Sequence, residues 1–162
     1  GAMNTTQYVI RRVRPDDLDA LVALCGEHAL YEKTSHDAAG KAEALSRALF
    51  SRPARLHAWV AEAAGELIGY ASAALEFSTW QAGEFLHMDC LFVRAGRRGG
   101  GAGAALLQAV RDFAGRAGCR EIQWQTPEWN VEAMRFYRRF GAVDKAKRRF
   151  FLPSASARPD QA

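Results

Sequence analysis

The stretch EFLHMDCLFVRAGRRGGGAG, residues 84–103, decides the fold. Its first half alternates with period two, which is typical of a β-strand. One row of this strand is wholly apolar and is expected to be buried: Leu86, Met88, Cys90 and Phe92. The opposite row places His87 and Asp89 among apolar neighbours. A glycine-rich turn and a helix-periodic segment follow directly, so the stretch predicts a strand, a tight turn and the start of a helix.

The glycine-rich turn, residues 96–103, is suited to binding phosphate groups. Glycines let a ligand approach the backbone closely, and the positive end of a helix dipole favours an anion. Arg97 and Arg98 add charge-assisted donors. The turn lacks the Gly-Lys-Ser/Thr ending of the nucleoside-triphosphate loop, and it lacks the acidic partner of a dinucleotide-binding fingerprint. The glycines alone fit a merely flexible turn equally well.

The rest of the chain predicts strands and helices that alternate around this segment. The other expected strands are residues 8–14, 57–62, 66–77, 121–126 and a last one near 143–152. The expected helices are residues 16–31, 37–50, 101–117 and 129–140. Ala64-Gly65 predicts a hairpin turn between two of the strands. This order implies an α/β protein, with a mixed sheet and helices on its faces.

Length and composition favour one globular domain. The chain has 162 residues, of which 49% are hydrophobic and 25% are charged, so it is expected to fold. No apolar run approaches the roughly 20 residues that cross a bilayer, and the start has no secretory signal, so we expect a cytoplasmic protein with no membrane partner. We expect a tag scar and tail over 1–7, the functional domain over 8–152 and a flexible tail over 153–162.

The cysteines and the net charge indicate which kinds of site and partner to expect. Cys25, Cys90 and Cys119 are odd in number and widely spaced, so neither a disulfide framework nor a metal site is expected. The formal net charge of +4 suits an anionic cofactor, and weak nucleic-acid contact would fit it equally well. A nucleic-acid-binding module is the weakest alternative, because no aromatic residues interleave with the basic run. We therefore expect no nucleic-acid partner.

Two motifs resemble one known family. The spacing Arg98-x-x-Gly101-x-Gly103 is similar to the acyl-CoA-binding signature of the GCN5-related N-acetyltransferases (GNAT). Residues 130–142 match that family's Asn-x-x-Ala-x-x-Phe-Tyr-x-x-x-Gly-Ala pattern. The resemblance spans about residues 8–152. It implies a single-domain mixed sheet that splays between its fourth and fifth strands, with acetyl-CoA in the gap, and it implies a homodimer.

The resemblance also implies which residues contact acetyl-CoA. They lie on the end of the central strand, on the glycine-rich turn and on the 129–140 helix. The expected contacts are Leu91, Phe92, Val93, Arg97, Arg98, Gly99, Gly100, Gly101, Ala102, Gly103, Ala104, Asn130, Ala133 and Tyr137.

Within the family the chain looks most like the diamine and polyamine N-acetyltransferase branch. The implied contacts to the amine substrate are Tyr31, Glu32, Trp80, Glu84, His87, Asp89, Gln123 and Glu128. In that branch a Glu at the position of Asp89 draws the proton from the amine, and the tyrosine at Tyr137 protonates the leaving thiolate. The chain departs from the branch in three ways: Asp89 is one methylene shorter, Cys90 replaces an acid, and the basic run 145–149 would repel a polycation.

The chemistry of acetyl transfer accounts for these residues without the family. An alkylammonium has a pKa of about 10.4, so either binding must favour its neutral form or a base such as Asp89 must remove a proton before attack. A backbone N–H near Leu91 can polarise the thioester carbonyl. Tyr137 can return a proton to sulfur. Cys90 as a covalent acetyl carrier is disfavoured because its row is apolar, so direct transfer in a ternary complex is expected.

Several alternatives stay open at this point. Asp89 could cap the nearby loop, Tyr137 could pack in the core, and Asn130 could serve only as a helix cap. His87, Trp80 and Trp129 are more readily explained by packing, and His28, His36 and His57 give no signal. The acceptor could instead be an aminoglycoside, an amino acid or a protein N-terminus. The domain could also be a CoA sensor without turnover.

Overall fold

The computed structural model describes residues 7–156 and contains a five-stranded sheet in the order β1-β2-β3-β4-β5. The strands are β1 (Val9–Arg12), β2 (His57–Ala63), β3 (Glu66–Ser78), β4 (Gly83–Val93) and β5 (Ile122–Gln123). Neighbouring strands from β1 to β4 are antiparallel, whereas β5 is parallel to β4. The predicted mixed sheet is therefore confirmed.

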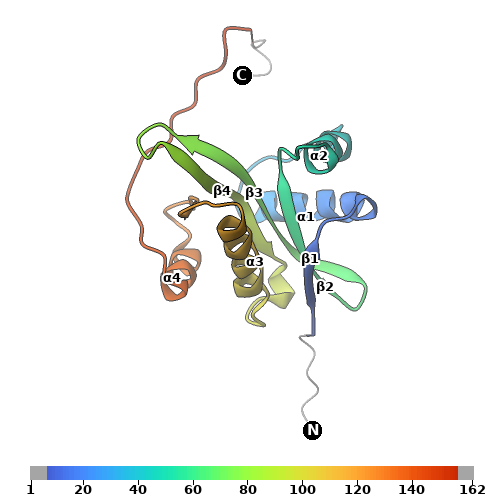
Figure 1. Ribbon diagram of the computed structural model, residues 1–162. Helices are drawn as coiled ribbons and strands as arrows, with labels where there is room; N and C mark the ends of the chain where they lie inside the picture. The colour runs from blue at the N-terminus through green and yellow to red at the C-terminus, as the bar shows by residue number, and fades with distance from the viewer. Residues whose placement is uncertain (1–6, 157–162) are drawn as a thin grey trace. The chain divides into compact units, whose positions relative to one another are not determined.

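Four α-helices accompany this sheet along the chain. They are α1 (Leu18–Tyr31), α2 (Lys41–Phe50), α3 (Ala102–Arg116) and α4 (Val131–Phe140), with single 3-10 turns at η1 (Pro15–Asp17) and η2 (Ala95–Arg97). Figure 1 shows α1 and α2 on one face of the sheet and α3 on the opposite face. Between β2 and β3, Ala64 and Gly65 have φ of 51° and 79°, which is the left-handed pair that a tight hairpin turn requires.

The described residues form two compact units, divided between Pro127 and Glu128. The first unit holds the sheet and helices α1 to α3, and the second holds α4 and the segment that follows it. The strand predicted near 143–152 is wrong, because this segment has no regular structure and Phe150 and Phe151 are exposed. A strand needs a hydrogen-bonded neighbour, and the described part of the second unit contains no other strand.

The ends of the chain are only partly described. Of the expected N-terminal tail, residues 1–6 lie outside the described residues, and of the expected C-terminal tail, residues 153–156 have no helix or strand and 157–162 lie outside. Over residues 7–156, no helix is both long and apolar enough to cross a membrane.

Two layers of packing hold the first unit together. On the α1 side the buried cluster is Val13, Leu21, Leu24, Leu49, Ala58, Val60, Leu67, Tyr70 and Phe92. On the α3 side Leu106 and Val110 are fully buried, and Trp59 of β2 meets Phe113 of α3 edge to face with ring centroids 5.5 Å apart. The sheet is therefore covered on both faces, which fixes the position of its central strand β4.

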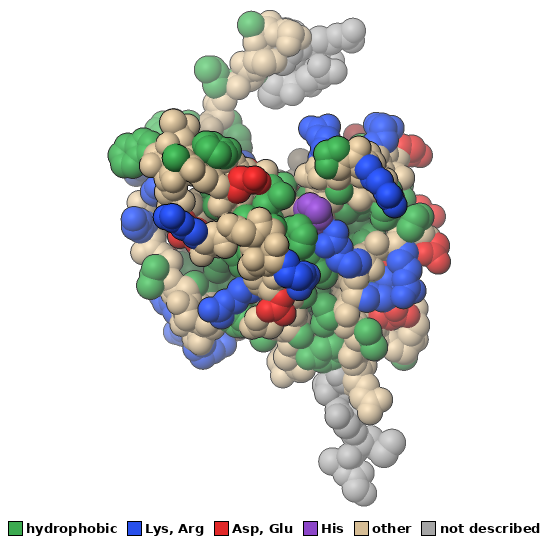
Figure 2. Space-filling view, in the orientation of Figure 1, with side chains coloured by type: hydrophobic (Ala, Val, Ile, Leu, Met, Phe, Trp, Pro, Cys, Tyr) green, Lys and Arg blue, Asp and Glu red, His purple; other side chains and the backbone are tan. Residues whose placement is uncertain are grey.

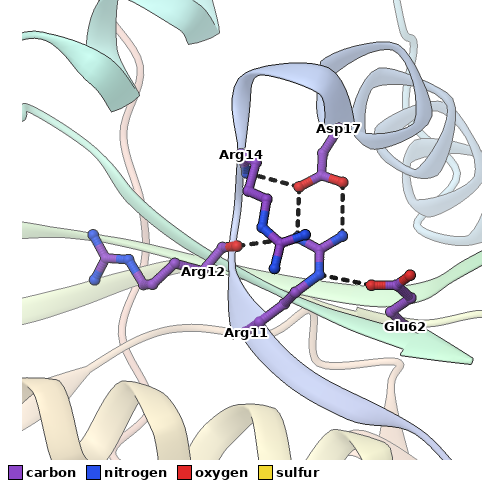
Figure 3. A network of polar contacts seen from close by, with 5 residues as sticks. All are labelled: Arg11, Arg12, Arg14, Asp17 and Glu62. Carbon is purple, nitrogen blue, oxygen red and sulfur yellow. Dashed lines mark hydrogen bonds and ion pairs between the residues drawn. The ribbon is translucent and has the colours of Figure 1, made fainter.

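A buried ion pair joins β1, η1 and β2 (Figure 3). Both terminal nitrogens of Arg11 donate to the Asp17 carboxylate, at 2.7 and 2.9 Å, and the backbone N–H of Arg14 donates to it at 2.7 Å. The Nε of Arg11 donates to Glu62 at 2.7 Å. The hydrogen bonds from Arg11 hold the pKa of Asp17 below its ordinary value of 3.8. This network fixes the entry into α1.

Asp17→Asn is expected to lower the free energy of unfolding by about 2–3 kcal/mol at pH 7, because it breaks charge-assisted hydrogen bonds in a buried place. A carboxyl with a lowered pKa stabilises the fold above its unfolded pKa and loses that contribution as the pH falls through its folded pKa. The difference between the two proteins should therefore shrink below about pH 4. Urea unfolding at pH 7 and pH 3 measures it, with the exposed Asp16→Asn as control. An equal loss in both variants would contradict this account.

Candidate functional site

The central strand β4 carries a β-bulge at Asp89. Ser72 of β3 pairs with Cys90, whereas the next residue, Ala73, pairs with Met88, so Asp89 has no partner of its own on β3. An extra residue of this kind bends the strand and re-aims its side chain, and such bulges are common beside active sites. Asp89 is solvent-exposed, and its Oδ2 lies 3.7 Å from the Cys90 Sγ. The bulge therefore presents a carboxylate at the middle of the sheet.

The bulge overturns the predicted apolar row. Trp59, which packs on α3, pairs with Ala71, and period-two counting then places Ala73 and its partner Met88 on the same α3 side. Cys90 and Phe92 instead pack with the cluster on the α1 side. Leu86 and Met88 therefore face α3, while Cys90 and Phe92 face α1. The prediction of a single row is wrong because one extra residue reverses the faces beyond it.

The edge of β4 beyond the bulge is open. β5 pairs with β4 only at Leu86 and His87, so the predicted strand 121–126 is much shorter than expected. Arg94 donates its backbone N–H to Ile68 on β3 at 2.8 Å, and successive N–H groups of a strand point to opposite edges. Those of Leu91 and Val93 therefore point away from β3, toward an edge with which no described strand pairs. The predicted splay between the fourth and fifth strands is confirmed.

The glycine-rich turn forms a cradle directly after this edge. Gly99 and Gly101 have φ of 87° and 88°, a left-handed conformation that favours glycine. The first helical hydrogen bond of α3 runs from the Ala105 N–H to Gly101 at 3.0 Å. The N–H groups of residues 102–104 therefore precede the hydrogen-bonding ladder of the helix, which is the usual position of anion-binding amides.

A cavity of about 240 Å³ lies against this turn. Its lining residues are Tyr8, Ala63, Ile68, Gly96, Arg97, Arg98, Gly99, Gly100 and Ala102. Amide donors, two guanidinium groups and no carboxylate make a lining that fits the phosphates of an acyl-CoA. Of the expected cofactor residues in the first unit, Arg97, Arg98, Gly99, Gly100 and Ala102 line this cavity, whereas Leu91, Phe92, Val93, Gly101, Gly103 and Ala104 are not among its lining residues. Sequence reasoning missed Tyr8, Ala63 and Ile68, which carry no local motif; Tyr8 directly precedes β1, and Ala63 and Ile68 lie on β2 and β3.

Arg98 connects the turn to the end of α1. Its Nε donates to the Val93 carbonyl at 2.9 Å. Its guanidinium carbon lies 4.2 Å from the centre of the Tyr31 ring and 5.6 Å from that of Phe92. Tyr31, expected to contact substrate, and Arg98, expected to contact the cofactor, are thus in direct contact. The glycine-rich turn and the end of α1, where contacts to the substrate are predicted, are therefore adjacent.

A polar cluster that the sequence did not indicate fills the space between α1 and β4. The Nδ1 of His28 lies 2.8 Å from the Tyr70 hydroxyl, and its Nε2 lies 3.0 Å from the Glu32 carboxylate. Its ring stacks on Phe92 with centroids 4.9 Å apart. Cys25 and Cys90 are partly buried and pack against the same cluster as Tyr70. The feature of the sequence that could have indicated this cluster is the i,i+4 spacing of His28 and Glu32, which places both side chains on one face of a helix.

Burial sets the protonation of this cluster. It lowers the pKa of His28, although the Glu32 carboxylate opposes that shift. It raises the pKa of Tyr70, and it raises the pKa of Cys90 to about 12 with help from the charge of Asp89. At neutral pH the imidazole is therefore uncharged, and the hydroxyl and thiol both keep their protons. A protonated thiol is a poor nucleophile.

The other expected substrate residues on the sheet lie further along it. His87 Nδ1 is 3.4 Å from the Glu76 carboxylate, and Gln123, which pairs with His87, donates to Glu121 at 2.8 Å. Glu84 lies at the start of β4, five residues before Asp89. Trp80 is 99% exposed in the turn between β3 and β4, so its interpretation as a packed residue is wrong. The turn between β3 and β4 lies at the end of these two strands, so few residues surround it and the Trp80 ring is left uncovered.

The second unit holds the remaining predicted residues. Asn130 is buried and caps α4, because its side chain accepts a hydrogen bond from the Ala133 N–H at 3.2 Å. Tyr137 lies on α4 with its ring 5.4 Å from that of Phe136. Glu128 and Trp129 precede the cap and are exposed. The capping role expected for Asn130 is confirmed.

Charge on the α1 and α2 side of the first unit is mixed. Figure 2 shows Lys and Arg side chains interspersed with Asp and Glu side chains around these helices. Ion pairs contribute to this pattern, such as Arg94 with Glu27 at 2.9 Å. This surface therefore carries no stripe of a single sign.

Comparison of the sequence with known proteins identifies the family of this chain. Residues 21–142 match the model of the acetyltransferase (GNAT) family. The chain is 31% identical over 144 residues to the thialysine N-epsilon-acetyltransferase of Bos taurus, which covers 84% of each protein. It is 30% identical over 143 residues to the Mus musculus protein of the same name, covering 83% of this chain and 84% of that protein.

Solved structures agree on the fold. An aminoglycoside N-acetyltransferase, AAC(6')-Iy in complex with CoA, superposes with a TM-score of 0.78 at 19% identity and covers 95% of this chain and 99% of its own. A transcriptional regulator from Bacillus halodurans superposes with a TM-score of 0.74 at 20% identity, covering 89% of this chain and 100% of its own. At such identities the likeness shows the fold alone.

Proposed function

The chain belongs to the acetyltransferase (GNAT) family, and from this we propose that it transfers the acetyl group of acetyl-CoA to the primary amine of a small molecule. The acceptor class we propose is a diamine, a polyamine or a lysine analogue, acetylated directly in a ternary complex. One observation carries the proposal: the Asp89 bulge, the open edge at Leu91 and Val93 and the cradle after β4 follow one another within a single unit.

The cradle is our proposed site for the phosphates of acetyl-CoA. The N–H groups of residues 102–104, together with Arg97 and Arg98, would hold them by charge-assisted hydrogen bonds. Bound acetyl-CoA supplies the thioester that is attacked. The Leu91 N–H points to the open edge of β4 and would polarise the thioester carbonyl, as an oxyanion-hole donor does.

Two side chains would move protons. Asp89 would accept the proton that an alkylammonium must lose before its nitrogen can attack. Tyr137, on α4, would give a proton to the leaving sulfur, and Asn130 and Ala133 of the same helix would contact the cofactor. Direct transfer is supported by the Cys90 thiol, whose raised pKa keeps it protonated and so unsuited to carry the acetyl group.

Two observations support the proposed acceptor class: the carboxylates near β3 and β4, and the names of similar proteins. Glu32, Glu76 and Asp89 place carboxylates on or beside the α1 face of β3 and β4, where they can pair with a second cationic group of the acceptor. Curated relatives are named for acetylating thialysine, a lysine analogue. The basic run 145–149 carries a positive charge that would repel a polycation. Assembly as a homodimer and a cytoplasmic location stay predictions.

A thiol-release assay tests the proposal directly. Acetyl-CoA is incubated with the protein and, in turn, with diamines, polyamines, lysine analogues, aminoglycosides, amino acids and peptides. Turnover with a diamine, polyamine or lysine analogue supports the proposed acceptor class. Turnover only with one of the other amines overturns that class and keeps the transferase. Silence across the panel with acetyl-CoA still bound would favour a CoA sensor.

The cradle can be tested by a matched pair of glycines. Gly99 and Gly118 both have a left-handed φ, of 87° and 79°, and a Cβ on either would meet no atom within 4 Å. Alanine therefore imposes the same backbone strain, of about 1 kcal/mol, at both positions. We expect Gly99→Ala to raise the Kd for acetyl-CoA by about tenfold, since one lost charge-assisted contact is worth that much, and Gly118→Ala to leave it unchanged. Equal effects in calorimetric titrations would refute the cradle.

A further inference from the structure

Glu32 places a carboxylate at the end of α1 that disfavours negative charge. It is the C-cap of the helix, and its backbone N–H donates to the His28 carbonyl at 2.9 Å. The C-terminal end of a helix dipole is negative, so it stabilises cations and disfavours a carboxylate. The Glu32 side chain is 29% exposed, so solvent screens this repulsion only in part. Glu32 and the helix end therefore create together a negative potential that attracts a cation.

The partner of this carboxylate is an uncharged group. Glu32 Oε2 lies 3.0 Å from His28 Nε2. Burial lowers the pKa of His28, so at neutral pH the imidazole is uncharged and donates its one N–H from Nε2. No Lys or Arg among the described residues forms an ion pair with Glu32, whereas Glu27 of the same helix pairs with Arg94 at 2.9 Å. A neutral donor orients the carboxylate without cancelling its charge, so that charge stays available to a ligand.

Two buried side chains of the sheet fix the His28 ring. The Tyr70 hydroxyl lies 2.8 Å from Nδ1, and because Nε2 donates to Glu32, this hydroxyl donates and Nδ1 accepts. The imidazole stacks on Phe92 with ring centroids 4.9 Å apart. Tyr70 and Phe92 are 3% and 6% exposed, and they are register partners on β3 and β4. Stacking therefore sets the plane of the imidazole, and the hydrogen bond sets its rotation and the nitrogen that carries the proton.

This arrangement lies near the carboxylate that is proposed to take the proton of the amine. Phe92 follows Asp89 by three residues on β4, which is about 10 Å along a strand. Tyr31, directly before Glu32, lies with its ring against the Arg98 guanidinium at the start of the cradle. An acceptor whose reacting amine is at Asp89 would therefore have a second carboxylate within the reach of a short chain.

We propose that His28 and Tyr70 are positioning residues for acceptor recognition, which hold Glu32 in place to bind the second positive charge of a diamine or a lysine analogue. This inference rests on the proposed acetyl transfer and adds to it a device that selects the acceptor. Neither side chain touches the reacting atoms. Their contribution is therefore to KM for acceptors with two ammonium groups, and an acceptor with one such group gains nothing from them.

Pairs of acceptors that differ by one charge test the proposal. One pair is 1,5-diaminopentane and pentylamine, and the other is thialysine and Nα-acetylthialysine, whose α-amino group carries no charge. The measurement is kcat and KM for each acceptor at saturating acetyl-CoA. The wild type should have the lower KM for the doubly charged member of each pair that it acetylates.

Three variants change the support of Glu32 step by step. His28→Leu removes the donor and keeps an apolar side chain against Phe92, so it should raise KM for the doubly charged acceptors about tenfold, the effect of one weakened charge-assisted contact. Tyr70→Phe removes only the hydroxyl that fixes the ring and should raise the same KM about threefold. His28→Gln restores an N–H donor toward Glu32 and should recover most of the loss. In all three, kcat and the KM of the singly charged acceptors should stay unchanged.

His57→Leu is the matched control, because it removes a histidine that contacts Arg12 and Phe113 instead, and it should change no KM. Equal changes for singly and doubly charged acceptors, or no change at all, overturn the positioning role, while wild-type turnover of these acceptors upholds the transferase. If the wild type acetylates neither pair, the inference fails together with the acceptor class, and turnover with another amine still upholds the transferase.

A double-mutant cycle decides the matter if His28→Leu fails to fold. Glu32→Gln keeps a hydrogen-bond acceptor for His28 and removes the charge, so it should raise KM for the doubly charged acceptors at least as much as His28→Leu. Tyr70→Phe should then raise that KM in the wild type and have no effect in Glu32→Gln, because it acts through the carboxylate. An equal effect of Tyr70→Phe in both backgrounds would show that the hydroxyl has only a structural role.

Discussion

Asp89→Asn is expected to lower kcat/KM for acetyl transfer by about 10²–10³-fold, within the usual worth of a general base. Asparagine matches the shape of aspartate and fits the same bulge, but it cannot take up a proton. The cradle for acetyl-CoA lies beyond the bulge, on the turn that follows β4, so the Kd for acetyl-CoA should stay unchanged. Steady-state kinetics and calorimetric titration measure the two quantities separately.

Two further variants serve as a rescue and a control for this experiment. Asp89→Glu restores a carboxylate on a longer side chain and should recover most of the activity. Asp112→Asn changes an exposed carboxylate on α3, which accepts a hydrogen bond from Gln108, and should have no effect on turnover. If Asp89→Asn retained wild-type kcat/KM, then Asp89 would have only the structural role of shaping the bulge.

Gly69→Ala is expected to lower the free energy of unfolding by about 1–3 kcal/mol and to weaken acetyl-CoA binding, because it overpacks the sheet at the open edge. Gly69 of β3 pairs with Val93, and a Cβ built on it would lie 2.7 Å from the Phe92 carbonyl oxygen. Backbone cannot move aside like a flexible side chain. The end of β4 must therefore shift, together with the Leu91 and Val93 N–H groups.

Gly115→Ala is the matched control for this change. Gly115 lies in α3, and a Cβ there would meet no atom within 4 Å. Alanine in a helix interior is favoured over glycine by up to about 1 kcal/mol, so this variant should be slightly more stable than the wild type. Thermal unfolding and titration with acetyl-CoA measure both variants. Unimpaired stability and binding in Gly69→Ala would show that β4 tolerates displacement at this point.

The sequence predicted the features that local patterns encode. The turn at residues 96–103 and the cap at Asn130 depend on residue types with particular backbone and capping preferences, and both are visible in a short window. The mixed sheet and the helices on its faces followed from the alternation of strand-like and helix-like segments along the chain. These features could therefore be predicted from residue order alone.

The features that were missed depend on contacts between distant segments. The bulge at Asp89 comes from the registration of β4 against Ser72 and Ala73, which period-two counting cannot detect. The cluster around His28 needs α1 and β3 to meet, and Tyr70 is 42 residues away in sequence. The strand expected near 143–152 has no described neighbour in its unit with which it could form hydrogen bonds.

In the proposed complex, Arg98 would make the binding of acetyl-CoA and the binding of the amine thermodynamically dependent on each other. Its guanidinium lies against the Tyr31 ring while its Nε is bonded to the strand that precedes the cradle. When acetyl-CoA immobilises the Arg98 side chain, it would also order the Tyr31 ring, which forms one wall of the proposed acceptor groove. The acceptor would then bind with a smaller loss of conformational entropy. Coupling of this kind is reciprocal: an amine that contacts Tyr31 must tighten the donor by the same factor. The consequence is synergy, with donor and amine each retained longer in the presence of the other.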